Sequence, residues 1–287
     1  MARYLDPKAD LTFKRIFGEH PDLLISFLNA LMPFEAGRVI ETIEYLPSEQ
    51  PPDTTRGKNS IVDVRCKDNF GRQFIVEMQM LWDEDFKNRI VFNAGKAYVR
   101  QLKRKGKYNS LQTVYTLAIL NENFDNSTEE FIHHFKIVNC NNINEIIPGL
   151  EFVLVELTEK FRPETISDRK LTVLWLRFLN EVGENMTKLP PEMQENELIS
   201  HAAELCEAGA FTPEELAVYD GYWDSIRVEA ALIDGALRKG RAEGETIGLE
   251  KVAINAHKAG HSIEVIATFT GLTPQQISEI LKQNNLV

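Results

Sequence analysis

Apolar and polar residues alternate with a period of two along residues 61–68 and again along residues 73–80. This alternation predicts two β-strands, because successive side chains of a strand point to opposite faces of a sheet. The segment between them, "NFGR", carries Gly71 where a three-residue hairpin loop needs a left-handed backbone. We therefore predict an antiparallel hairpin in which residues 69–71 form the loop.

The register of this hairpin sorts its side chains into two faces. It places Asp63 directly across from Glu77 and Ile61 across from Gln79, so that the three polar groups share one face. The other face is a continuous apolar surface suited to a protein core. Its residues are Val62, Val64, Cys66, Phe74, Val76, Met78 and Met80.

The patterns on either side of the hairpin predict a mixed α/β domain. Apolar residues recur at helical spacing, and two continuous apolar runs are typical of buried strands. We expect two helices, three strands, a helix, two more strands and an amphipathic covering helix. The helices lie within residues 11–31, 86–105 and 167–182, and the strands within residues 38–50, 61–68, 73–80, 111–121 and 150–157.

The rest of the chain differs in character. Residues 198–255 are predicted to be mostly helical, and residues 262–283 read as two short helices around a turn at Gly271. We therefore expect three parts: a domain at 1–183, an acidic helical region at 184–245 and a small helical, helix-turn-helix-like module at 246–287.

Composition and charge narrow the class of protein. The 287 residues lack the roughly 18 consecutive apolar positions of a membrane span, the three cysteines lie far apart, and the N-terminus is charged. We expect a cytoplasmic protein with no membrane partner. The net charge of −11 hides a segment, residues 86–107, with eight bases and no acid. That segment is suited to binding a polyanion.

The opposed carboxylates of the hairpin suggest chemistry. Asp63 and Glu77 would have Cβ atoms roughly 5 Å apart and would repel each other without a cation or proton between them. Mg²⁺, which binds one or two carboxylates together with water and phosphate oxygens, fits such a pair. The alternative is an ordinary solvated face. Ile61 and Ile75 interrupt that face, and a basic helix follows it, which favours a site that cleaves phosphodiesters.

Three stretches of the chain also resemble a known family. They are "DPKADLTFKRIFG", "IVDVRCKDNFGRQFIVEMQM" and "NRIVFNAGKAYVRQLKRKGKYNSLQTVYTLAIL". Together they resemble the PD-(D/E)XK nuclease superfamily, and within it the Rpn or YhgA-like "PD-(D/E)XK nuclease family transposase" group. The resemblance covers residues 1 to about 160 closely. It implies a restriction-endonuclease-like αβββαβ core and metal-dependent endonuclease activity on DNA.

The resemblance also implies roles for individual residues. Asp63 and Glu77 would bind Mg²⁺, or Mn²⁺ or Ca²⁺ in its place, and the backbone carbonyl of Met78 would complete the coordination. Gln79 would orient the attacking water. Asp10 is a candidate additional acid.

The chain departs from the family motif in two places. Val62 replaces the proline before the first acid, and Gln79 replaces the usual lysine, although glutamine is typical of the Rpn-like group. The second departure removes a positive charge that can hold or deprotonate water. Lys14 or Lys58 is the candidate that would supply the missing cation.

The basic helix is the expected contact with DNA. Arg89, Lys96 and Arg100 would hold flanking phosphates without reading bases. The rival hypothesis is a non-catalytic module that binds nucleic acid or protein through a degenerate nuclease fold. The biological role could lie in recombination, mobile-element movement or defence against phage.

Two interpretations of the C-terminal module remain open. Thr273 could cap a recognition helix on which Gln275 and Gln276 read bases. Against this, residues 262–287 hold one base, Lys282, and two acids. We therefore favour a regulatory or oligomerisation module. The resemblance implies self-association through this segment and, in some members, a separately made inhibitory C-terminal fragment.

Overall fold

The computed structural model describes residues 3–35, 37–50, 60–102, 106–163 and 170–287. The chain separates into two compact units, Met1–Ile226 and Arg227–Val287. Lys58 lies outside the described residues, as does part of the basic segment, residues 103–105. No helix in the described part of the chain has the length and apolarity that crossing a membrane requires.

A six-stranded sheet with the order β1-β4-β5-β6-β8-β7 forms the centre of the first unit. Pairing is antiparallel for β1/β4, β4/β5 and β7/β8, and parallel for β5/β6 and β6/β8. The helix α3, Phe86–Arg100, connects β5 to β6. The strands are β1 (Ile43–Tyr45), β4 (Val64–Asp68), β5 (Gln73–Gln79), β6 (Val114–Leu120), β7 (Ile132–Asn139) and β8 (Asn142–Glu156).

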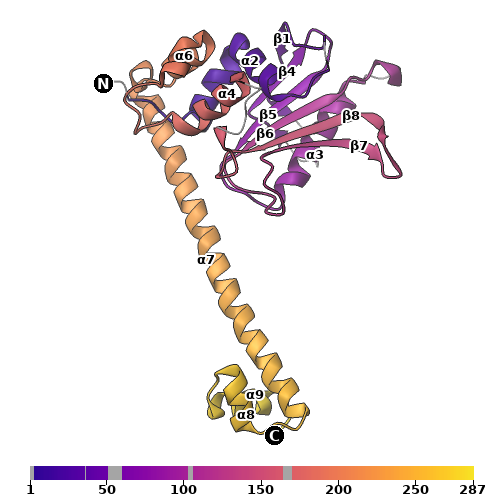
Figure 1. Ribbon diagram of the computed structural model, residues 1–287, viewed down its shortest axis with the longest axis vertical. Helices are drawn as coiled ribbons and strands as arrows, with labels where there is room; N and C mark the ends of the chain where they lie inside the picture. Colours follow the sequence, from indigo (N-terminus) through magenta and orange to yellow (C-terminus); the bar gives the residue numbers. More distant parts are fainter. Residues whose placement is uncertain (1–2, 36, 51–59, 103–105, 164–169) are drawn as a thin grey trace. The chain divides into compact units, whose positions relative to one another are not determined.

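Helices cover both faces of the sheet (Figure 1). One face packs against α1 (Asp10–Glu19), α2 (Pro21–Leu31) and α4 (Lys170–Glu181), with residues such as Phe17, Phe27 and Trp175 in the core. The other face packs against α3. The chain is thus a mixed α/β protein consistent with a PD-(D/E)XK-like fold, as the sequence predicts.

The predicted hairpin forms with the expected register over most of its length. Val64 pairs with Val76 and Cys66 with Phe74, and Gly71 has the left-handed φ of 80° that the loop requires. Residues 69–71 lie between the paired strands. The predicted loop position was therefore sufficient to identify which residues of β4 and β5 oppose one another.

The first strand of the hairpin is broken at residues 62–63, which the alternation did not predict. Ile61 does not lie across from Gln79; it belongs to β3 (Ser60–Ile61) and pairs with Glu49 of β2 (Glu49–Gln50). The Val62 N–H donates to the carbonyl of Ser48 at 3.2 Å, so the chain leaves β5 here. Val62 consequently packs on the α3 face of the sheet, not on the face predicted from alternation.

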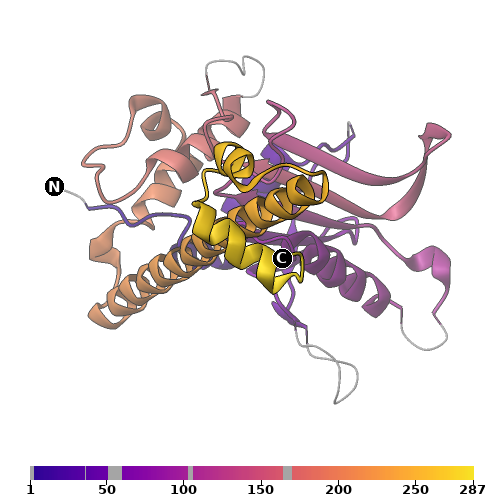
Figure 2. The ribbon, with the colours of Figure 1, turned by 90° about the horizontal axis from the view of Figure 1, so that it is seen from below.

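The strand β7 was absent from the predicted elements, and β8 begins earlier than expected. The two form a long hairpin that extends beyond the rest of the sheet (Figures 1 and 2). Most of its residues are exposed, including Phe135 and Ile137. A strand with two exposed faces leaves no alternation in the sequence.

Further helices are found in both units. In the first unit these are α5 (Pro191–Glu195), α6 (Glu197–Glu204) and short 3₁₀ turns at Tyr108–Ser110 and Ala208–Ala210. The long helix α7, Pro213–Lys258, begins in the first unit and continues into the second. The predicted boundary after residue 245 falls inside α7, and the three-part division remains a prediction.

The second unit has its own small core. The end of α7 packs against α8 (Ile263–Thr270) and α9 (Pro274–Gln283) through Ala253, Ile266, Ile277 and Leu281. Gly271 joins α8 to α9 with a φ of 70°, as the predicted turn requires.

Candidate functional site

The strand break places the carboxylate of Asp63 beside β5. Asp63 Oδ2 accepts a hydrogen bond from the Met78 N–H at 2.7 Å. In an uninterrupted ladder that N–H would donate to a backbone carbonyl of the neighbouring strand. The side chain of Asp63 therefore replaces a ladder bond, and its carboxylate is held at the edge of β5 close to Glu77.

Glu77 lies on β5 beneath α3 and is buried. Asn93 on α3 is also buried, and its Nδ2 donates to Glu77 Oε1 at 3.0 Å. Burial, reinforced by the charge of Asp63, raises the pKa of the Glu77 carboxyl to about 7. Burial also raises the pKa of Asp63 to about 6, although the bond from Met78 opposes the shift. These two acids are thus poorly stabilised as anions by the protein alone.

Gln79 follows at the end of β5, where both ends of its amide are engaged. Its Nε2 donates to the carbonyl of Leu81 at 2.5 Å, and its Oε1 accepts from Arg89 Nη2 at 2.6 Å. Arg89 Nη1 also donates to Asp83 Oδ2 at 3.3 Å. The basic helix therefore reaches the motif residues directly.

The donor set in this region fits a hard cation. Asp63 and Glu77 supply two carboxylates, and the Met78 carbonyl points to the same side of β5 as the Met78 N–H that meets Asp63. The described residues contain no group of three or more His, Cys, Asp or Glu side chains placed to hold a metal ion. Mg²⁺ requires only one or two protein carboxylates, because water and substrate oxygens complete its coordination shell.

The candidate residues on α1 lie within electrostatic reach of Asp63. Asp10 raises the pKa of Asp63, whereas Lys14 lowers it. The Lys14 ammonium is 2.6 Å from Asp10 Oδ1, in a partly exposed ion pair. The cation of Lys14 is therefore balanced by an adjacent acid.

The other two predicted DNA contacts on α3, Lys96 and Arg100, interact with neighbouring residues. Lys96 donates to the backbone carbonyl of Gln50 on β2. Arg100 is partly buried. Burial of Arg65 lowers the pKa of its guanidinium, and the positive charge of Arg100 lowers that pKa further. Contact of either residue with DNA remains a prediction.

Asn93 is the residue that the sequence interpretation missed. It occupies a helix position three residues after the buried Ile90 and four before the buried Ala97. A polar residue on the buried face of an amphipathic helix needs a hydrogen-bond partner, which is the signal that could have identified it.

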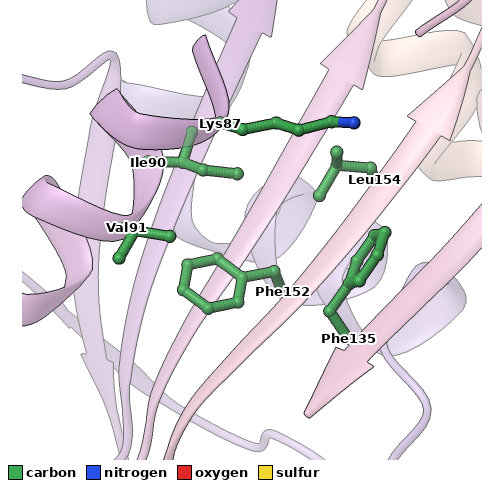
Figure 3. Close-up of a pocket in the computed structure, with 6 residues that line it drawn as sticks. All are labelled: Lys87, Ile90, Val91, Phe135, Phe152 and Leu154. Atoms are coloured by element: carbon green, nitrogen blue, oxygen red, sulfur yellow. The ribbon is translucent and has the colours of Figure 1, made fainter. Parts of the chain in front are cut away.

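The flank of α3 that faces β7 and β8 is largely apolar. A cavity of about 190 Å³ lies between α3 and the strands β7 and β8 (Figure 3). Lys87 extends along its rim, with its ammonium 4.7 Å from the ring centre of Phe124. The cavity is lined by Lys87, Ile90, Val91, Phe135, Phe152 and Leu154.

Comparison with known families agrees with this arrangement. The family described as PD-(D/E)XK nuclease family transposase matches residues 7–236, which include the sheet, α3 and every residue of the carboxylate site. No curated protein and no solved structure matches the chain. Because the matched region exceeds half of the sequence, the chain belongs to the PD-(D/E)XK nuclease family transposase family.

Proposed function

We propose that the chain is a metal-dependent endonuclease that hydrolyses phosphodiester bonds in DNA. The observation that carries the proposal is the juxtaposition of Asp63 and Glu77 at the edge of β5, both with raised pKa values. A divalent cation bound between two neighbouring carboxylates would stabilise their negative charges, which the protein alone stabilises poorly. Family membership supports a function related to nucleases and transposases.

Asp63 and Glu77, with the Met78 carbonyl, would hold Mg²⁺, Mn²⁺ or Ca²⁺. When bound, such an ion lowers the pKa of water and polarises a phosphoryl oxygen. Asn93 fixes the orientation of Glu77. Gln79 retains a second hydrogen-bonding position on each end of its amide, with which it can orient water.

The reaction is the hydrolysis of one ester bond. The oxygen of a water molecule forms a bond to phosphorus and releases one proton to solvent. One P–O ester bond breaks, and the departing oxygen takes up a proton. The products are a phosphomonoester end and a hydroxyl end.

DNA would be held mostly through its backbone. Arg89, Lys96 and Arg100 lie on α3, and phosphate contacts from a helix position a duplex without reading its sequence. The net charge of −11 requires this contact to be local. Binding should therefore weaken steeply as salt rises.

Nicking of supercoiled plasmid tests the proposal. Full-length protein with Mg²⁺ or Mn²⁺ should nick the plasmid, and neither the chelator control nor Asp63→Asn should do so. Glu84→Gln, an exposed acid outside the site, is the matched control and should retain activity. Nicking by Asp63→Asn at the rate of the unmodified chain would contradict the assignment.

The alternative is a non-catalytic binding module, which the glutamine at position 79 favours because it lacks the usual lysine charge. The two functions differ in metal dependence. A binding module would bind DNA in the presence of chelator and would produce no metal-dependent nicks.

For the second unit we propose self-association. Leu232, Leu237 and Ile247 on α7 are 70%, 60% and 50% exposed, and an isolated helix gains stability by burying such residues. Gln276 completes a capping box with Thr273, which reduces its freedom to read bases. An inhibitory C-terminal fragment would use the same surface.

Light scattering tests self-association. It should give an oligomer for the full chain and a smaller species for Leu237→Glu. A monomer in both would contradict the proposal.

The family description supports a role in recombination or mobile-element movement, with defence against phage as the alternative. We expect this role to be performed in the cytoplasm.

A further inference from the structure

Gln79 occupies the position at which the family motif has a lysine. Its side-chain amide accepts a hydrogen bond from a cationic residue, Arg89. Arg89 Nη2 donates to Gln79 Oε1 at 2.6 Å, and the bond from Gln79 Nε2 to the Leu81 carbonyl fixes which end of the amide faces α3. A glutamine fixed in this way positions a guanidinium at the end of β5. The positive charge missing from the strand is therefore present on the neighbouring helix.

The charge of Arg89 acts on both acids of the site. It lowers the pKa of Asp63 and that of Glu77, against the burial that raises them. Lys14 contributes to lowering the pKa of Asp63 and is paired with Asp10. Among the described residues, Arg89 is the cation that combines contact with the third motif residue and electrostatic reach to both acids.

Arg89 is also accessible to a substrate. Its side chain is 41% exposed, and its ion pair with Asp83 is long at 3.3 Å and lies at the surface. Exposed ion pairs of this kind contribute little to stability. A phosphate can therefore displace Asp83, and the planar guanidinium can bind two phosphoryl oxygens at once.

We infer that Arg89, positioned by Gln79, is the catalytic cation of this site and takes the role of the missing lysine. The inference rests on the proposed nuclease function. The guanidinium binds the scissile phosphate and stabilises the negative charge that grows on its oxygens as water attacks. This role differs from gripping a flanking phosphate, because it lowers the barrier of the chemical step.

Lys87 provides a matched control on the same helix. It carries the same charge two residues away, but it lies on the opposite flank of α3 beside the apolar cavity (Figure 3). Arg89→Ala and Lys87→Ala each remove one positive charge and should weaken binding of a DNA duplex, measured in Ca²⁺, to a similar small extent. Arg89→Ala should in addition lower the single-turnover cleavage rate at saturating DNA by roughly 10²–10³-fold, whereas Lys87→Ala should leave that rate unchanged.

A rescue variant separates catalysis from structure. Gln79→Lys combined with Arg89→Ala returns the charge to the strand and should regain most of the lost single-turnover rate. Melting temperatures of all variants verify that they are folded. A folded double variant that remains as slow as Arg89→Ala contradicts the inference.

The outcomes separate this inference from the proposed function. If the unmodified chain cleaves DNA and Arg89→Ala cleaves it as fast as Lys87→Ala does, Arg89 is merely a phosphate contact and the inference fails alone. If the unmodified chain binds DNA but never cleaves it with metal, the nuclease proposal fails and the inference fails with it.

Discussion

Two buried glutamates, at the ends of different strands of the same sheet, are treated in opposite ways by their surroundings. Glu156 at the end of β8 accepts hydrogen bonds from the N–H groups of Phe124 and Asp125, at 2.6 and 3.1 Å, and pairs with Lys160 Nζ at 2.7 Å. Two backbone donors and the Lys160 ammonium thus stabilise its negative charge, and His133 Nε2 lies 3.4 Å from Oε2. Glu156 therefore fastens the loop after β6 to the end of β8.

Glu77 on β5 has a different environment. It accepts from the neutral amide of Asn93 and lies near a second acid, Asp63, whose charge raises its pKa. The charge of Arg89 only partly offsets the burial of Glu77, and structures retain a buried carboxylate of this kind where a ligand completes it. The comparison teaches that burial alone does not identify a functional acid; the balance of donors and charges around it does.

The largest expected effect is on catalysis at β5. Glu77→Gln preserves the shape of the side chain and can still accept from Asn93, but it removes the charge that a metal ion needs. Cleavage of plasmid should fall by roughly 10³-fold, equivalent to about 4 kcal/mol of barrier. Activity within about tenfold of the unmodified chain would show that Glu77 holds no essential ion.

The same substitution at β8 should affect stability and not chemistry. Glu156→Gln leaves the buried Lys160 ammonium without its anion, which should lower the free energy of unfolding by about 3 kcal/mol. Chemical denaturation measures this loss. At a temperature where the variant is folded, its cleavage rate per folded molecule should equal that of the unmodified chain; a catalytic loss as large as that of Glu77→Gln would break the comparison.

The amide of Asn93 should tune the affinity for metal. Asn93→Ala removes the hydrogen bond that orients Glu77, and the loss of such outer contacts typically weakens metal binding by about 10–100-fold. The measurement is the Mn²⁺ concentration required to raise the melting temperature. Asn88→Ala, an exposed asparagine on the same helix, is the control and should not alter that concentration.

The smallest expected effect is a pH dependence of stability without metal. Because the carboxyl pKa values of Asp63 and Glu77 are higher in the folded chain than in the unfolded one, the folded chain binds more protons between the two values. Unfolding then releases protons, so this contribution to stability is full at low pH and is lost as pH rises through about 6 to 7. Glu77→Gln should remove part of the slope, about 1–2 kcal/mol between mildly acidic and mildly alkaline pH. Identical slopes in both proteins would contradict the raised pKa of Glu77.

The sequence predicted the structure well where the regular spacing of apolar residues determines whether a segment is a strand or a helix. Alternation predicted the strands β4 and β5, the loop at residues 69–71 predicted their register, and the patterns on either side predicted the helices α1, α2 and α3. These patterns reflect burial on one face, which the order of residues records directly. The mixed α/β fold followed from the order of the elements.

The details of the site depend on contacts that no local pattern records. The break at Val62 arises because its N–H donates to the carbonyl of Ser48, the residue just before β2. The contacts of Arg89 with Gln79 and of Asn93 with Glu77 join a helix to a strand through side chains. Sequence reasoning placed Arg89 on a phosphate-binding helix but had no means of orienting that helix about its axis.

The segment from Asp63 to Asn93 contains both acids of the proposed site, its glutamine, its arginine and its supporting amide. The contacts among them close short loops, which require less chain entropy than contacts between distant segments. The site should therefore assemble early in folding, as the β4–β5 hairpin and α3 meet, before β7 and β8 add to the sheet. In native-state hydrogen exchange, the Met78 amide held by Asp63 should report the opening of this whole segment as one cooperative unit.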